Sequence, residues 1–136
     1  MSDATRSQET AKLAAALASA QKAFAPIPKD REVTVKTKTG GSYKFRYATL
    51  DAIRAATMPA LAEQGLAISQ GLRERGTNLW AVETMLLHAS GEWISNVTPM
   101  IIQGREGSPP GNQELGSAQT YARRYGWSAI PMLPRT

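Results

Sequence analysis

The chain has 136 residues, 42% of them hydrophobic, which suits one compact domain over residues 1–136 and leaves no room for a second core. It has no cysteine and one histidine, His88, which argues against zinc and redox sites, because these need thiolate or imidazole ligands. The formal net charge of +5 favours a polyanionic partner such as nucleic acid, since a positive surface attracts phosphates.

The first part of the chain predicts a helix and then a β-hairpin. Apolar residues recur at helical spacing over residues 7–24, and the prolines at 26 and 28 end this helix. Residues 33–38 and 43–47 then alternate in character around Gly40 and Gly41, as the strands of a hairpin do. Residues 1–6 are expected to be a flexible N-terminus.

A second helix should begin at Thr49, whose hydroxyl suits an N-cap, and close at Gly65. Pro59 should kink or split it, because proline lacks the backbone donor of an inner turn. Three further strands are predicted over residues 66–72, 79–88 and 93–100. Residues 104–112 should form a flexible loop, and a last helix is expected over 113–127. These elements predict an α+β fold with a five-stranded, mainly antiparallel sheet.

Alternation separates two faces of the hairpin. The odd positions carry apolar residues, namely Val33, Val35, Tyr43, Phe45 and Tyr47. The even positions carry basic residues, namely Lys36, Lys38, Lys44 and Arg46. We predict a three-residue loop from Thr39 to Gly41, with Gly41 in the left-handed conformation. This loop pairs Lys36 with Lys44, so like charges face each other unless an anion such as a phosphate backbone lies over them. An ordinary solvated sheet face is the alternative.

The last helix offers a second basic surface. At about 100° per residue, one arc gathers the apolar residues Leu115, Ala118, Tyr121, Ala122 and Tyr125. The opposite arc carries Gln113, Ser117, Thr120, Arg123 and Arg124. Small side chains admit a sugar-phosphate chain, and each guanidinium can donate two parallel hydrogen bonds, so Arg123 and Arg124 suit a clamp on the DNA backbone. Capping of the helix C-terminus is the alternative role for both.

The remaining aromatic and basic residues are predicted to stack on bases, to be buried, or to contact DNA at the edge of the site. Tyr47 and Tyr121 border the basic surfaces and are the candidates for stacking on bases. Burial is the commoner fate at Trp80, Trp93 and Tyr125. Neighbouring acids cancel the charge of three arginines, which predicts rim contacts that steer DNA without holding it: Arg73, Arg75 and Arg105.

Enzyme signatures are absent from the sequence. No glycine-rich loop ends in Gly-Lys-Ser or Gly-Lys-Thr, no Gly-x-Ser-x-Gly occurs, and His88 lacks an evident acidic partner. The acidic residues are scattered along the sequence, whereas a two-metal nuclease needs several of them close together. A magnesium nuclease is therefore kept as an alternative function without a supporting motif. No apolar run could span a membrane. We therefore expect a cytoplasmic, non-enzymatic protein without a cofactor.

Two blocks of sequence resemble the Erf family of phage single-strand annealing proteins. They are residues 47–53, Tyr-Ala-Thr-Leu-Asp-Ala-Ile, and residues 116–125, Gly-Ser-Ala-Gln-Thr-Tyr-Ala-Arg-Arg-Tyr. The segments around residues 59–66 and 86–92 also resemble the family's middle region, so the similarity spans most of the chain from the first helix onward.

The resemblance implies a curved antiparallel sheet with a long helix packed across it and the N-terminal helix alongside, assembled into a ring or filament. It implies a groove between sheet and helix that holds single-stranded DNA, with the hairpin lysines and the two helix arginines on its walls. The implied function is ATP-independent annealing of complementary strands in phage recombination; a passive single-strand binder, or an RNA binder, is the alternative. Host single-strand binding protein is a further expected partner, although family members commonly reach it through a tail beyond the last helix, and we expect that tail to be absent from a sequence that stops at Thr136.

Overall fold

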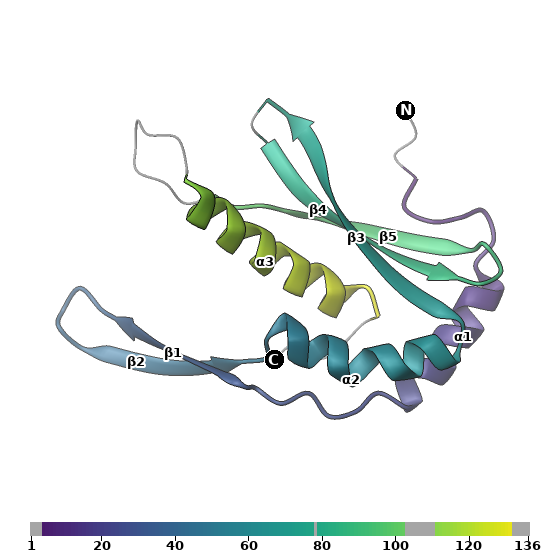
Figure 1. The fold of residues 1–136 in the computed structure, drawn as a ribbon, viewed down its shortest axis with the longest axis horizontal. Helices are drawn as coiled ribbons and strands as arrows, with labels where there is room; N and C mark the ends of the chain where they lie inside the picture. Colours follow the sequence, from purple (N-terminus) through teal and green to yellow (C-terminus); the bar gives the residue numbers. More distant parts are fainter. Residues whose placement is uncertain (1–3, 78, 103–110, 132–136) are drawn as a thin grey trace.

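The computed structural model describes residues 4–77, 79–102 and 111–131 (Figure 1). Its elements, in chain order, are α1 (Ala11–Lys22), β1 (Arg31–Lys36), β2 (Ser42–Tyr47), α2 (Leu50–Glu63), β3 (Leu66–Gly76), β4 (Leu79–His88), β5 (Trp93–Pro99) and α3 (Asn112–Ala129). The fold is α+β, as expected, and every strand pairing between named strands is antiparallel.

The strands form two sheets, so the prediction of one five-stranded sheet is wrong. One sheet contains β3, β4 and β5 in that order, and the other is the β1–β2 hairpin alone. The hairpin extends away from the other elements as an arm (Figure 1). Alternation identified all five strands but carried no information about which strands share hydrogen bonds.

All three helices pack on one face of the three-stranded sheet. Leu66 and Leu86 on that face join a buried cluster with Leu13 of α1 and Leu61 of α2. The helix α3 crosses the same face, where the Gln70 side chain donates to the carbonyl of Arg123 at 2.8 Å. The long helix predicted to lie across the sheet and the N-terminal helix alongside it are therefore both present.

Small residues bring α3 close to the sheet. Ala118, Ala122 and Gly126 are its buried residues along one stripe, together with Trp127. A Cβ atom at Gly126 would overlap the Thr84 side chain of β4, so only glycine fits this contact without a shift. This close contact sets how near the backbone of α3 lies to β4.

The helix α2 begins and ends as predicted. The Thr49 hydroxyl accepts a hydrogen bond from the Ala52 amide at 3.2 Å, and Gly65 has the left-handed φ of +74° that closes the helix. Pro59 lies inside the helix and does not split it. Asp30, just ahead of β1, accepts hydrogen bonds from the Thr49 amide at 2.9 Å and hydroxyl at 2.8 Å, which ties the base of the hairpin to α2.

The segments near α1 are also held in place. Thr5 accepts a hydrogen bond from the Ser95 amide at 2.7 Å, so part of the expected flexible N-terminus pairs along β5. Glu92, in the turn between β4 and β5, accepts a hydrogen bond from the Leu13 amide at 2.8 Å and so caps the first turn of α1. Residues 104–110 of the predicted loop over 104–112 lie outside the described residues.

The hairpin loop is three residues long, but it is shifted by one position from the prediction. The Thr37 amide donates to the carbonyl of Gly41 at 2.8 Å, which leaves residues 38–40 as the loop. Gly40, and not Gly41, takes the left-handed conformation, with φ of +89°. Because the shift moves the register by two residues, the faces keep their composition while the cross-strand partners change.

Candidate nucleic-acid interface

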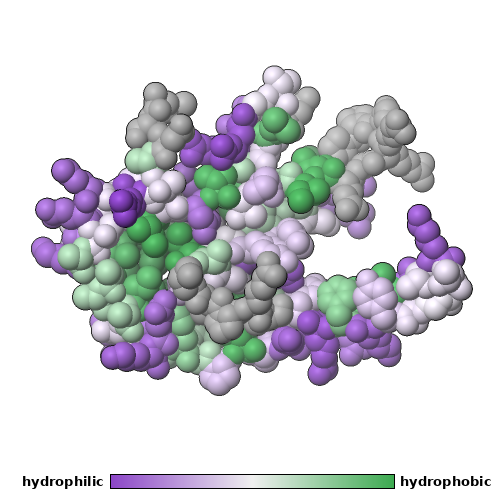
Figure 2. All heavy atoms as spheres, turned by 180° about the vertical axis from the view of Figure 1, so that it is seen from behind, coloured by the Kyte–Doolittle hydropathy of each residue, from purple (hydrophilic) through white to green (hydrophobic). Residues whose placement is uncertain are grey.

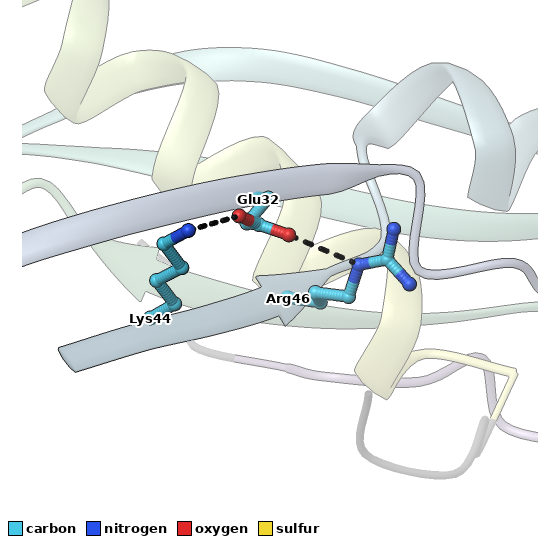
Figure 3. Close-up of polar contacts among 3 residues, drawn as sticks. All are labelled: Glu32, Lys44 and Arg46. Atoms are coloured by element: carbon cyan, nitrogen blue, oxygen red, sulfur yellow. Dashed lines mark ion pairs between the residues drawn. The ribbon is translucent and has the colours of Figure 1, made fainter.

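The outer face of the hairpin, defined here by Glu32, Lys36, Lys44 and Arg46, contains an acid that the prediction left out. In the observed register Glu32 lies opposite Arg46, and Lys44 lies opposite Thr34, so no two lysines face each other. Glu32 pairs with Lys44 at 3.7 Å and with Arg46 at 3.6 Å (Figure 3). The predicted repulsion across this face is therefore wrong, and these exposed side chains resemble a solvated surface more than an empty phosphate site.

The inner face of the hairpin, which carries the odd positions, is apolar and aromatic. Tyr43 and Phe45 expose 54% and 44% of their surface, although rings of this size are usually buried. In Figure 2 the hairpin arm is hydrophilic along the side turned away from the rest of the molecule and paler along the side that faces it. The arm therefore turns its aromatic residues toward α3.

A groove of about 1190 Å³ separates this inner face from α3. The hairpin side supplies Val33, Phe45 and Tyr47, whereas α3 supplies Thr120, Tyr121, Arg123, Arg124 and Tyr125. The base of the hairpin contributes charges of both signs to the lining, from Arg31, Asp30 and Asp51. On the α3 side, the charged residues in the lining are both arginines. The volume exceeds the roughly 300–1,000 Å³ of ordinary small-molecule sites, which favours an extended ligand.

Arg124 lines the groove among three tyrosine rings. Its guanidinium carbon lies 4.3 Å from the ring centroid of Tyr47 on β2, and 5.4 Å from those of Tyr121 and Tyr125 on α3. We call these three rings the tyrosine cage. A guanidinium stacked in this way uses its π face, so its N–H groups, which point outward in the plane of the fork, can still donate to phosphate oxygens.

Arg123 is held by the sheet. Its Nε donates to the Gln70 Oε1 at 3.3 Å, and Gln70 in turn donates to the hydroxyl of the buried Thr84 at 3.0 Å. Both arginines lie more than one turn before the end of α3, whose last turn carries no basic residue. The alternative role as C-terminal caps is therefore wrong for Arg123 and Arg124.

The structure brings together only part of the predicted site. Five of its residues line the groove: Tyr47, Thr120, Tyr121, Arg123 and Arg124. Lys36, Lys44 and Arg46 lie on the outer face, and Lys38 is in the hairpin loop, so the expectation that hairpin cations and helix arginines share one trough is wrong for these four. Phe45 was predicted only as an apolar strand residue and Tyr125 as buried, yet Tyr125 is 42% exposed and both line the groove.

The predicted rim residues have different surroundings from those expected. Arg73 pairs with Glu83 on β4 at 3.1 Å rather than with its neighbour Glu74. Arg75 is exposed near the end of β3, and Arg105 lies outside the described residues. Among the described residues, no group of three or more His, Cys, Asp or Glu side chains is placed to hold a metal ion.

One carboxyl group at the groove has a shifted titration. The hydrogen bond from the Thr49 amide, followed by the one from the Thr49 hydroxyl, lowers the pKa of Asp30 below its ordinary value of 3.8. Asp30 therefore stays ionised at neutral pH, and its charge is committed to the junction between the hairpin and α2.

Comparison with known protein families defines the class of this chain. The model of the ERF superfamily matches residues 13–132, which include every helix and strand after the first two residues of α1. The protein therefore belongs to the ERF superfamily, as its sequence blocks suggested. No curated protein and no solved structure matches the chain. No helix in the described part of the chain is long and apolar enough to cross a membrane.

Proposed function

We propose that this protein binds single-stranded DNA in the groove between the hairpin and α3 and anneals complementary strands without ATP. The observation that carries the proposal is that Arg123 and Arg124 line the same groove as the aromatic inner face of the hairpin, in a chain of the ERF superfamily. Cations beside aromatic rings along an extended groove are the usual means of holding single strands without regard to sequence.

The α3 side of the groove is suited to the DNA backbone. Gly116, Ser117 and Thr120 border it with small side chains, so a sugar-phosphate chain can approach the helix. Arg123 and Arg124 then donate to phosphate oxygens, while the aspartates Asp30 and Asp51 at the hairpin base keep phosphates away from that side. Partial neutralisation of one strand lowers its repulsion of a second strand, and base pairing supplies the free energy of annealing.

Assembly of several copies into a ring or filament is part of the proposal, as is a non-enzymatic mechanism. Both rest on membership of the superfamily, and mass photometry with and without single-stranded DNA measures the assembly directly. Expected cellular partners are the single strands of a recombining phage genome and, in the host cytoplasm, the host's single-strand binding protein.

Two double variants with equal charge changes test the groove. Arg123→Ala with Arg124→Ala removes two cations from the groove, whereas Lys44→Ala with Arg46→Ala removes two from the outer face. We expect the first pair to weaken binding of a labelled single strand and to reduce the slope of log affinity against log salt by roughly 1.4, at about 0.7 per lost phosphate contact. The second pair should change the slope much less.

The outcomes separate the competing functions. Equal effects of the two double variants would refute the groove as the binding site and leave only general electrostatic attraction. An annealing time course with complementary oligonucleotides is the second measurement, in which the wild type should accelerate pairing. Tight binding without acceleration would identify a passive single-strand binder instead, and magnesium-dependent degradation of the labelled strand would identify a nuclease.

A further inference from the structure

The strand β2 carries three aromatic residues at alternate positions, Tyr43, Phe45 and Tyr47, which we call the aromatic ladder. Their ring centroids are 6.4 Å apart between Tyr43 and Phe45 and 6.2 Å apart between Phe45 and Tyr47. Both neighbouring pairs share the same interplanar angle of 34°. The rings therefore form a regular row on the inner face of the hairpin, in which Tyr43 and Phe45 are about half exposed and Tyr47 is partly buried. Exposed aromatic surface of this kind marks a binding surface.

The surroundings of the aromatic ladder identify the chemistry of its ligand. Phe45 and Tyr47 line the groove together with Arg123 and Arg124, and Tyr43 continues the row toward the hairpin loop. A ligand that meets both walls needs negative charge on one side and flat apolar surfaces on the other. Every nucleotide of single-stranded DNA has both. We infer that the two exposed rings of the aromatic ladder, Tyr43 and Phe45, stack the bases of the bound strand, one base beside each ring, whereas the ring of Tyr47 is already covered by the Arg124 guanidinium; this inference rests on the proposed function.

The spacing of the rings sets the shape of the strand. Bases held beside Tyr43 and Phe45 must be about 6.4 Å apart, close to twice the roughly 3.4 Å rise per nucleotide of a B-form strand. The strand is thus stretched, and its bases are separated from one another. Stacking engages the faces of the bases and leaves their hydrogen-bonding edges open to a complementary strand.

This geometry also discriminates against duplex DNA. In a duplex both faces of each base are covered by neighbouring bases, and the rise is half the spacing of the ladder. Pairing on the protein therefore draws the bases off the rings as the duplex rise is restored. The aromatic ladder holds the substrate of annealing and lets go of its product.

A strand without bases tests the inference on the unaltered protein. Fluorescence anisotropy compares a labelled thymidine oligonucleotide with an abasic strand of equal length, which has the same phosphates. We expect the thymidine strand to bind roughly tenfold more tightly or better, from stacking of one or more bases. Equal affinity would overturn the inference and leave the proposed function standing, because phosphate contacts need no bases. Failure to bind either strand would overturn both.

Paired variants assign the effect to the exposed rings. Tyr43→Leu with Phe45→Leu removes both rings, whereas Tyr43→Phe with Phe45→Tyr keeps them in the same positions. The leucine variant should bind the thymidine strand and the abasic strand within about twofold of each other, and the ring-keeping variant should retain the wild-type ratio, with circular dichroism confirming that both fold. If the leucine variant instead keeps the ratio and loses its assembly in mass photometry, the aromatic ladder is a contact between copies and the inference fails.

Discussion

Replacing Gly126 with alanine should destabilise the protein, even though alanine is the better helix former. The new Cβ would overlap the side chain of Thr84, which is fully buried and β-branched, so it has little freedom to move aside. Overpacking of this kind typically costs about 1–3 kcal/mol, while the gain in helix propensity is about 1 kcal/mol. We therefore expect a net loss of roughly 0–2 kcal/mol in the free energy of unfolding.

The same helix provides a matched control at Gly116. A Cβ there meets nothing within 4 Å, so Gly116→Ala should stabilise the protein by up to about 1 kcal/mol through propensity alone. The difference between the two variants isolates the steric cost and should be about 1–3 kcal/mol, or roughly 1 M in urea midpoint. Urea unfolding followed by circular dichroism measures it. Equal midpoints for the two variants would refute the close approach of α3 to β4 at Gly126.

Two further predictions concern junctions that hold the elements in place. Because hydrogen bonds from Thr49 lower the pKa of Asp30 below 3.8, its contribution to stability is complete above that value and is lost as pH falls through the lowered pKa. Urea midpoints of the wild type should thus fall relative to Asp30→Asn below about pH 4, and parallel curves would contradict this. Glu92→Ala leaves the amide of Leu13 without its acceptor and should cost about 1 kcal/mol of stability, measurable by the same titration; an unchanged midpoint would exclude the cap.

Local chemistry explains the parts of the fold that the sequence predicted well. The β4 strand occupies the predicted residues, because a run of apolar and β-branched residues is bounded by turn residues on both sides. The caps of α2 at Thr49 and Gly65 depend on single side chains or single φ values. At Pro59 the alternative of a split is wrong, since α2 runs on through the proline, and the alternative of a kink stays a prediction.

The errors concern contacts between segments. Gly40 and Gly41 both tolerate a left-handed conformation, so the sequence left the loop position uncertain by one residue and the register by two. That shift places Glu32 beside Lys44 and Arg46, which changes the outer face from a row of unpaired cations into an ion-pair cluster. The separation of the hairpin from the other strands depends on tertiary packing, which alternation does not encode.

The sequence predicted the arginines of the candidate site but not all of its aromatic residues. Periodicity placed Arg123 and Arg124 on the side of α3 opposite its apolar arc, and both line the groove, although Arg123 also bonds to Gln70 of the sheet. The same reasoning placed Phe45 on an apolar strand face and Tyr125 on a helix face expected to be buried. A helical or strand period says which residues share a face but not whether another element covers that face.

Within the described ranges, the contacts that fasten the hairpin to the rest of the protein lie near its base. Asp30 bonds to Thr49 where the arm begins, and Arg124 meets Tyr47 where it finishes, whereas the loop at Gly40 is remote from both fastenings. A two-stranded ribbon has little rigidity of its own. The base of the hairpin would therefore hold a bound strand in a fixed position, while the loop end can move to follow the shape of that strand. A fluorescent probe attached at Thr39 should report entry of the ligand before one placed beside Tyr47.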